Sequence, residues 1–287
     1  LLPVLCAAQP GPWWAYGFGG PADDRFTAIA RGPADTLYAC GTFSGLMNTF
    51  NGPVISAGVT DVFLVKMDTV GNVFWTSTAG GPGVDRATDI AVDNEGNIFV
   101  TGQFSGTFTA GSIALTSNGP SQDIFLTKWN AAGQALWARA AGSTGNTDIA
   151  ENVAVDAAGN CWIAGQFSGT ALFGGLSVTS TFDPQLNALG DDVFIARYNS
   201  DGDPLWVKKG AAIHHDQALG LAVDAAGNSW LAGQFSDVIT FDQAHVNTLN
   251  DAAFVVAFDP VGNEQWFRRI GGGGSVLAGD LCEADGM

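Results

Sequence analysis

The pattern of apolar and polar positions repeats along this chain. The stretch "DIAVDNEGNIFVTGQFSG" begins at Asp89, and close copies of it begin at Asn152 and Gly220. Around the first of these copies, short runs rich in Val, Ile, Phe and Thr predict four strands, at 88–93, 97–104, 123–129 and 134–142. No long stretch has the apolar spacing of a helix, so the chain is predicted to be all-β.

Two independent markers share one period. Tryptophans recur every 60 to 69 residues, at Trp14, Trp75, Trp137, Trp206 and Trp266. The motif G-x-F-S recurs in step with them, at Gly41, Gly102, Gly165 and Gly233. A fixed period of this length indicates a repeat architecture, in which each unit buries its faces against the next one.

A turn of the form [DN]-x-x-G-[NQD] separates strands within each unit. It starts at Asp68, Asp93, Asn130, Asp156, Asn199, Asp224 and Asp259. The leading Asp or Asn can accept hydrogen bonds from nearby backbone amides, and the Gly supplies the positive φ of a tight hairpin. The eighth expected turn, "RGPADT" from Arg31, departs from the pattern. A calcium loop needs further oxygen ligands and a distant Glu, which are missing, so these turns predict no metal site.

The strands "IFLTKW" and "NIFVTG" are apolar on both faces, as in sheets packed between two neighbours. Four-stranded antiparallel units repeated in this way predict a β-propeller. The coils of a β-solenoid are much shorter than this period, and a tandem of small barrels needs linkers that the sequence does not contain.

The repeats resemble those of the bacterial SBBP β-propeller repeat family, which occurs in secreted and surface proteins. "DIAVDNEGNIFVTGQFSG", "DIFLTKWNAAGQALWA" and "DVFIARYNSDGDPLWV" carry the resemblance, which extends over residues 13 to 270. The resemblance implies a scaffold fold and indicates almost nothing about catalytic activity. The segment D-x-x-G-x-x-x-W is also similar to the tryptophan-docking repeat of quinoprotein propellers, which implies that Trp75, Trp137, Trp206 and Trp266 are wedges between blades. A quinone enzyme would need a metal site and cofactor-binding residues, which are not identifiable, so no cofactor is predicted.

The predicted organisation is a remnant of a signal peptide at 1–9, a leading outer strand at 10–20, and four blade repeats at 21–83, 84–146, 147–212 and 213–272. Residues 273–287 start a further repeat or form a tail. The leading strand lacks its own partners in this count. The four units therefore form an incomplete ring, or the chain is part of a longer one.

The net charge and the composition of the chain reduce the range of functions to be considered. The net charge is −17 with eleven Lys and Arg, which argues against nucleic-acid binding. The apolar start followed by "QPGP" is typical of the end of a secretory signal and predicts a secreted or cell-surface protein. No later run is long enough to span a bilayer. Four cysteines stand at unrelated repeat positions, Cys6, Cys40, Cys161 and Cys282, and are predicted to be buried free thiols.

Candidate chemistry gathers on one face of the propeller. The connections from Phe43 to Asp61, Phe104 to Asp123, Phe167 to Asp192 and Phe235 to Ala252 vary most in length, and recognition is commonly built on such loops. On the same face lie Asp24, Asp85, Asp148 and Asp216. A ring of carboxylates could hold a cation, but a recurring Asp at this place more often caps a turn. The cluster "HHD" consists of His214, His215 and Asp216, and adjacent histidines on an extended chain point to opposite sides.

The favoured function is a non-catalytic scaffold that binds a glycan or a protein through this variable face, and the oligomeric state is left open. Asp148, His214, His215 and Asp216 are weak ligand-binding candidates. The first alternative is an enzyme of hydrolase or lyase type at the mouth of the central channel, with Asp148, His215 and Asp216 as its best residues. The second is an architectural spacer of a longer surface protein. No catalytic motif and no metal site is predicted.

Overall fold

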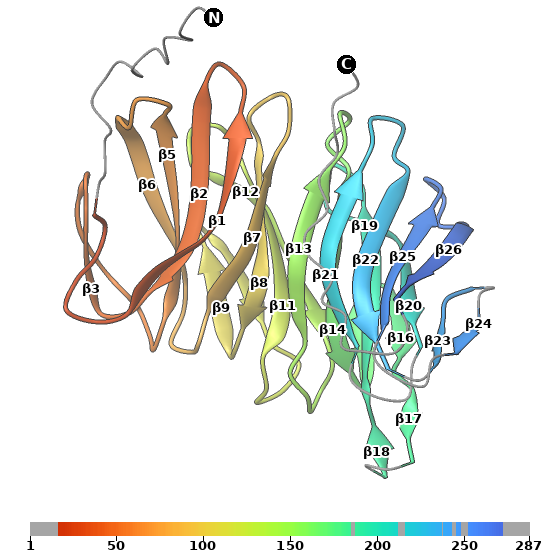
Figure 1. Ribbon diagram of the computed structural model, residues 1–287. Coiled ribbons are helices and arrows are strands. Elements are labelled where there is room, and N and C mark those ends of the chain that lie inside the picture. Colours follow the sequence, from red (N-terminus) through yellow and green to blue (C-terminus); the bar gives the residue numbers. More distant parts are fainter. Residues whose placement is uncertain are drawn as a thin grey trace, which may run out of the picture.

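The computed structural model describes residues 17–184, 187–211, 216–236, 238–242, 245–247 and 252–271, and these form strands and no helix. The all-β prediction is therefore confirmed. The strands form four antiparallel four-stranded units, here called blades 1 to 4, and the sheets of blades 1 and 2 are each extended to six strands by a hairpin of the next unit (Figure 1). Blade 1 consists of β1 (Asp24–Gly32), β2 (Thr36–Phe43), β5 (Asp61–Asp68) and β6 (Val73–Gly80), and blade 2 of β7 (Arg86–Val92), β8 (Ile98–Phe104), β11 (Asp123–Trp129) and β12 (Ala135–Gly142). Blade 3 consists of β13 (Ile149–Val155), β14 (Cys161–Ser168), β19 (Asp191–Tyr198) and β20 (Pro204–Gly210). Blade 4 consists of β21 (Gln217–Val223), β22 (Ser229–Phe235), β25 (Ala252–Phe258) and β26 (Glu264–Ile270).

Several predicted features lie outside the described residues. These are the signal remnant, Trp14, the two histidines His214 and His215, Cys6, Cys282 and the segment 273–287. Cys40 and Cys161 are described, and both are buried free thiols as predicted. Burial raises the pKa of Cys40 to about 12, so this thiol is inert at neutral pH.

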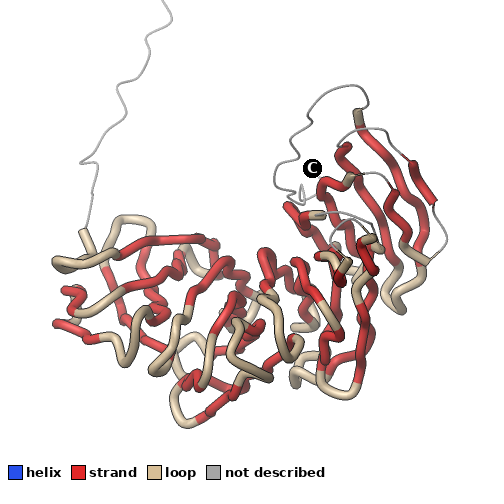
Figure 2. The backbone as a smooth tube through the Cα atoms, turned by 90° about the horizontal axis from the view of Figure 1, so that it is seen from below, coloured by secondary structure: helices blue, strands red, loops and turns tan. Residues whose placement is uncertain are grey.

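The blades stand side by side with their first strands innermost. β1 packs beside β7, β7 beside β13, and β13 beside β21 (Figure 1). Figure 2 shows the blades arranged along an arc, with blade 4 turned away from the line of the first three. Blade 1 and blade 4 do not meet, so the described residues form an open arc and not a closed ring.

Each seam between blades contains an apolar core. At the first seam, Cys40, Val62 and Leu64 of blade 1 cluster with Ile90 and Val100 of blade 2, and all five side chains are buried. The second and third seams have cores of the same kind. Strands that are apolar on both faces are therefore explained, because the two middle blades bury both sides of their sheet.

The repeated glycine of G-x-F-S allows a close approach within each blade. The innermost strand carries a β-bulge, for example between Ala87 and Asp89, opposite this glycine. A Cβ on Gly102 would lie 2.0 Å from the carbonyl oxygen of Arg86, and one on Gly165 would lie 1.9 Å from that of Ile149. Any side chain at this position would displace the inner strand, which explains why the repeat keeps glycine here.

The variable connections contain hairpins that the sequence did not predict. They are β3 (Leu46–Thr49) with β4 (Gly52–Ile55), β9 (Thr107–Ala110) with β10 (Ile113–Thr116), β15 (Thr170–Phe173) with β16 (Leu176–Thr179), and β23 (Val238–Thr240) with β24 (His245–Asn247). Each hairpin pairs with the chain of the preceding unit: β9 with β6, β15 with β12, Thr240 with Ala211, and Asn48 with Gly19. These segments therefore seal the seams and are only in part free recognition loops.

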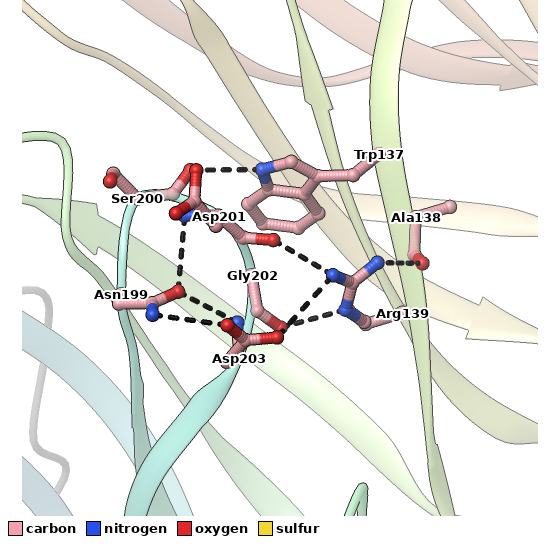
Figure 3. Close-up of polar contacts among 8 residues, drawn as sticks. All are labelled: Trp137, Ala138, Arg139, Asn199, Ser200, Asp201, Gly202 and Asp203. Carbon is pink, nitrogen blue, oxygen red and sulfur yellow. Dashed lines mark hydrogen bonds and ion pairs between the residues drawn. The ribbon is translucent and has the colours of Figure 1, made fainter.

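Tryptophan closes the other end of each seam. The indole nitrogens of Trp75, Trp137 and Trp206 donate hydrogen bonds to the carbonyl oxygens of Ala131, Ser200 and Pro260, each in a turn of the next blade. Figure 3 shows Trp137 lying against Gly202 of such a turn, with Arg139 donating to the carbonyls of Gly202 and Asp201. At the fourth of these positions, Trp266 meets no further blade within the described part of the chain and is 38% exposed.

In all seven regular turns, Oδ1 of the first residue accepts from two backbone amides. In the two Asn-led turns the Asn side chain also donates to Gln134 or Asp203, whereas in the five Asp-led turns the carboxylate accepts. In the turn from Asp93, the Oδ1 atom accepts from the backbone amides of Glu95 and Asn97, and the Asn97 side chain donates to Oδ2. The exceptional turn in blade 1 instead places Ala34 and Asp35 at positive φ, with Thr36 donating to the Pro33 carbonyl. It still closes the β1–β2 hairpin, as a primed turn without glycine.

Candidate functional site

The four predicted ring aspartates lie where the chain enters each blade. Asp85, Asp148 and Asp216 are buried, whereas Asp24 is partly exposed. Their carboxylates accept hydrogen bonds from backbone amides: Asp24 from Gly20, Asp85 from Gly81, Asp148 from Ser143 and Ser168, and Asp216 from Ser236. They cap turns at the seams, and three of the four are shielded from a ligand.

Each buried ring aspartate has a second carboxyl near it that the sequence analysis missed. These partners are Asp61, Asp123 and Asp192, which stand at or near the start of the third strand of the preceding blade. A Cβ on Gly142 would lie 2.7 Å from Oδ1 of Asp123 and 3.0 Å from Oδ2 of Asp148, so both carboxyls lie against one glycine. The Asp that opens "DVF", "DIF" and "DVF" was the available signal.

Burial and mutual repulsion perturb these carboxyls. Burial, with a smaller contribution from the charge of Asp61, raises the pKa of Asp85 to about 7, and burial with the charge of Asp192 raises that of Asp216 to about 9. Burial raises the pKa of Asp123 to about 6 in the same way, with Asp148 adding to the effect. At each pair, burial and the neighbouring carboxyl therefore disfavour the ionised form. Among the described residues, no group of three or more His, Cys, Asp or Glu side chains is placed to hold a metal ion.

A polar groove lies on the concave side of the arc, along β1, β7 and β13. It is an open cavity of about 710 Å³ whose lining includes Asp23, Asp24, Arg25, Arg86, Gln103 and Glu151. Asp24 is the one predicted ring residue that reaches it. Asp85, Asp148 and Asp216 do not line this groove, so the structure does not bring the proposed carboxylate set together in a ligand-accessible place.

The inner strands supply equivalent residues to the groove. Arg25 and Thr27 of β1 and Arg86 and Thr88 of β7 line it. A β-bulge lies between Phe26 and Ala28 and between Ala87 and Asp89, so the regular alternation of a strand is interrupted at both threonines. Blade 3 contributes Ile149 and Glu151 at the same two positions. Because the inner strands stand side by side, equivalent residues of three blades form two rows across the groove.

The groove combines donors and acceptors for hydrogen bonds. Arg25 and Arg86 are exposed, and neither forms an ion pair within the described residues. Burial raises the pKa of Glu151, whose carboxyl lies in the groove wall. Two guanidinium groups without partners, in a chain of net charge −17, offer planar sites for carboxylates or sugar hydroxyls. Both arginines directly follow a ring Asp in the sequence, and that repeated Asp-Arg pair was the signal that could have found them.

The longest variable connection adds a second exposed feature. It contains an extra hairpin of β17 (Phe182–Asp183) and β18 (Ala188–Leu189), which projects beyond the sheets at the lower end of Figure 1. Phe182 and Leu189 are paired across it, and both are exposed. The hairpin thus places one aromatic and one aliphatic side chain in contact with solvent.

Comparison with known proteins agrees with the geometry. Residues 75–103, from the tryptophan of β6 through β8, match a family model described as SBBP, beta-propeller repeat. An uncharacterized WD repeat-containing protein of Acanthamoeba polyphaga mimivirus is 31% identical to the chain over 169 residues, which is 54% of this chain and 12% of that protein. The chain therefore spans a small part of the length of this relative.

Fold and comparison together define the class: the molecule is built from β-propeller repeats. More particularly, residues 75–103 match the SBBP repeat, and this segment runs from β6 of blade 1 through β8 of blade 2. The fold is one that commonly supports binding and scaffolding, because rigid blades position grooves and loops at fixed distances.

Proposed function

We propose that this protein is a non-catalytic propeller scaffold that binds an extended, carboxylate-bearing glycan or protein segment in the inner groove. The observation that supports the proposal is the pair of exposed, unpaired arginines at equivalent positions of blades 1 and 2. Guanidinium groups bind carboxylates in a bidentate manner, and the neighbouring Gln103 and Thr42 add uncharged hydrogen-bonding groups. The projecting Phe182 hairpin supports a further contact with the same partner.

The test uses two probes that share the carboxylate but differ in class. Oligogalacturonate represents an acidic glycan, and an oligoglutamate peptide represents an acidic protein segment. Calorimetric titration of the 287-residue chain is expected to detect binding of one of them. The double substitution R25A/R86A is expected to weaken this binding at least about tenfold, since each charged hydrogen bond contributes about 1.5–3 kcal/mol.

The matched control is Arg31→Ala. Arg31 is also exposed but forms an ion pair with Asp35 at 2.8 Å in the β1–β2 turn, at the opposite end of the strand from Arg25. This variant should bind as the unmodified chain does. Binding that survives the double substitution, or a chain that binds neither probe, would contradict the groove as the site.

The location of the protein is part of the proposal. The apolar start and the Gln-Pro-Gly-Pro break support secretion or display at the cell surface, and the SBBP resemblance supports a bacterial origin. None of the described segments forms a helix that could cross a membrane. Fusing residues 1–20 to a reporter that is active only after export in a bacterial host tests secretion, and a reporter retained inside the cell would contradict it.

A further inference from the structure

The two ends of the arc expose the unmatched halves of the seam that joins the blades. Inside the molecule, Ile90, Val153 and Leu221 occupy the same position of the inner strand and are 5%, 6% and 7% exposed, each packed in a seam core. The equivalent residue of blade 1, Ile29, is 65% exposed. It borders an apolar cavity of about 290 Å³ that Phe18, Phe26 and Met67 also line. Among residues 17–271 as described, blade 1 therefore presents a seam surface that no other blade covers.

Blade 4 exposes the opposite side of a seam, namely the side that blades 1 to 3 each pack against the following blade. Four residues after the repeated tryptophan, Ala79 and Ala141 are buried in seams, whereas Ile270 is 53% exposed. Tyr38, Phe99 and Trp162 are buried at one position of the second strand, whereas the equivalent Trp230 is only partly buried. This surface of Trp230, Trp266 and Ile270 is the half-seam that every other blade offers to its successor.

The polar contacts of that half-seam are already arranged. Arg268 lies over the ring of Trp266, with its carbon Cζ 5.8 Å from the ring centroid, as Arg139 lies over Trp137 at 5.4 Å. Arg268 donates to the carbonyl of Phe267 just as Arg139 donates to that of Ala138. Arg139 uses its remaining nitrogens to hold the turn of the next blade, whereas blade 4 has no next blade within the described residues.

We infer that blade 4 of one copy of this chain docks on blade 1 of a second copy, so that two arcs close into a ring of eight blades. The exposed half-seams are the two sides of an interface that the chain forms three times internally, and this continuity identifies the occupant. Eight blades lie within the range of known propellers, and a closed two-fold dimer leaves no half-seam uncovered. The apolar surfaces drive the association, whereas the net charge of −17 on each copy opposes it.

The test measures the mass of the chain by sedimentation as its concentration rises. A dimer is expected, with an affinity that increases with salt because screening weakens the repulsion between the two acidic copies. Ile29→Lys and Ile270→Lys each place a charge in the interface and should weaken the dimer at least about 100-fold. Both side chains are solvent-exposed in the single chain, so folding, checked by thermal melting of dilute protein, should be unchanged.

Mixing the two variants gives the decisive measurement. The I29K chain keeps a normal blade 4 surface and the I270K chain keeps a normal blade 1 surface, so a mixture should regain one intact interface and form a heterodimer. Ile55→Lys is the matched control, because Ile55 is 76% exposed and its equivalent Thr116 is exposed even where a neighbouring blade is present. Monomers at every concentration, open polymers, or a mixture that fails to associate would overturn the inference.

Discussion

Gly202 shows why one residue type serves two purposes in the repeated turn. Its φ of +79° lies in the region that side chains disfavour, and its open face receives the ring of Trp137 (Figure 3). A Cβ at this position would lie 2.9 Å from the indole. The same holds for Gly133 under Trp75 and Gly262 under Trp206, so the glycine closes the turn and also forms the seat of the tryptophan.

Replacing this glycine should therefore destabilise the protein. We expect Gly202→Ala to lower the free energy of unfolding by about 2–4 kcal/mol, from the positive φ and from the displaced indole. Denaturant unfolding measures the change. Gly175→Ala is the control, because a Cβ at Gly175 meets no atom within 4 Å, and a comparable loss in both variants would contradict the assigned role.

At this scale much could be predicted from the sequence. The turn chemistry is local, so "NSDGD" and its sister motifs predicted their own hairpins. The turn of Ala34 and Asp35 could not be predicted, because positive φ at residues other than glycine depends on the strands that the turn joins. The repeated Asp-Arg pair distinguishes Arg25 and Arg86 in the sequence, but their exposure could not be predicted, since the sequence does not specify which face of the inner strand meets solvent.

Among the elements, the seam hairpins are the main surprise. The strands β9 and β15 are short and polar in part, and each pairs with a strand of the previous blade and not with the rest of its own four-stranded sheet. The strand pattern of the blades themselves was predictable because all their pairing partners are consecutive. A pairing that crosses from one unit to the preceding one has no local sequence signal, which is why these segments were interpreted as loops.

The buried carboxyl pairs at the seams predict a pH dependence. The pKa of Asp85 is raised to about 7 in the folded chain, above its usual value of 3.8, so the folded state holds this proton more tightly than the unfolded one. The stabilisation is complete below the usual pKa and is lost as the pH rises through about 7; for Asp216 it is lost through about 9. Between about pH 5 and pH 8 the free energy of unfolding should fall by about 2–3 kcal/mol on account of Asp85, with a further decrease from Asp216.

Asp85→Asn isolates this effect, because an amide keeps the shape of the neutral carboxyl and does not ionise. The variant should lose part of the pH dependence in denaturant unfolding series. Asp259→Asn removes the same charge from a solvent-exposed turn, where the backbone amide and side chain of Asn263 lower the pKa of Asp259. It should retain the pH dependence; equal slopes for the two variants would show that net charge alone is responsible.

For the whole molecule, the groove exists only because three blades stand side by side. Arg25, Arg86 and Glu151 are far apart in the chain, and their approach depends on the packing of β1, β7 and β13. Repeat periodicity predicted that the blades would pack against one another, but not which repeat positions would meet a ligand. The fold was thus largely predictable, whereas the site required the arrangement in space.

The tryptophans allow a test of how the seams join the blades. Trp137→Ala should lower the free energy of unfolding by about 3–5 kcal/mol, since it empties the seam between blades 2 and 3. Trp266→Ala, at the same repeat position but on an open face, should cost much less. Both are compared by calorimetry of dilute protein, in which copies of the chain do not associate. Similar losses for the two would show that the indole stabilises its own blade and not the seam.

The way in which neighbouring blades are joined has a consequence for how such molecules evolve. At each junction the tryptophan of the earlier blade donates to a turn of the later blade, and the hairpin of the later blade pairs with the last strand of the earlier one or with the residue directly after it. A unit that carries both the tryptophan and the hairpin can therefore pack against a duplicate of itself with the contacts that it already makes. Tandem duplication or deletion of one unit therefore preserves every remaining junction.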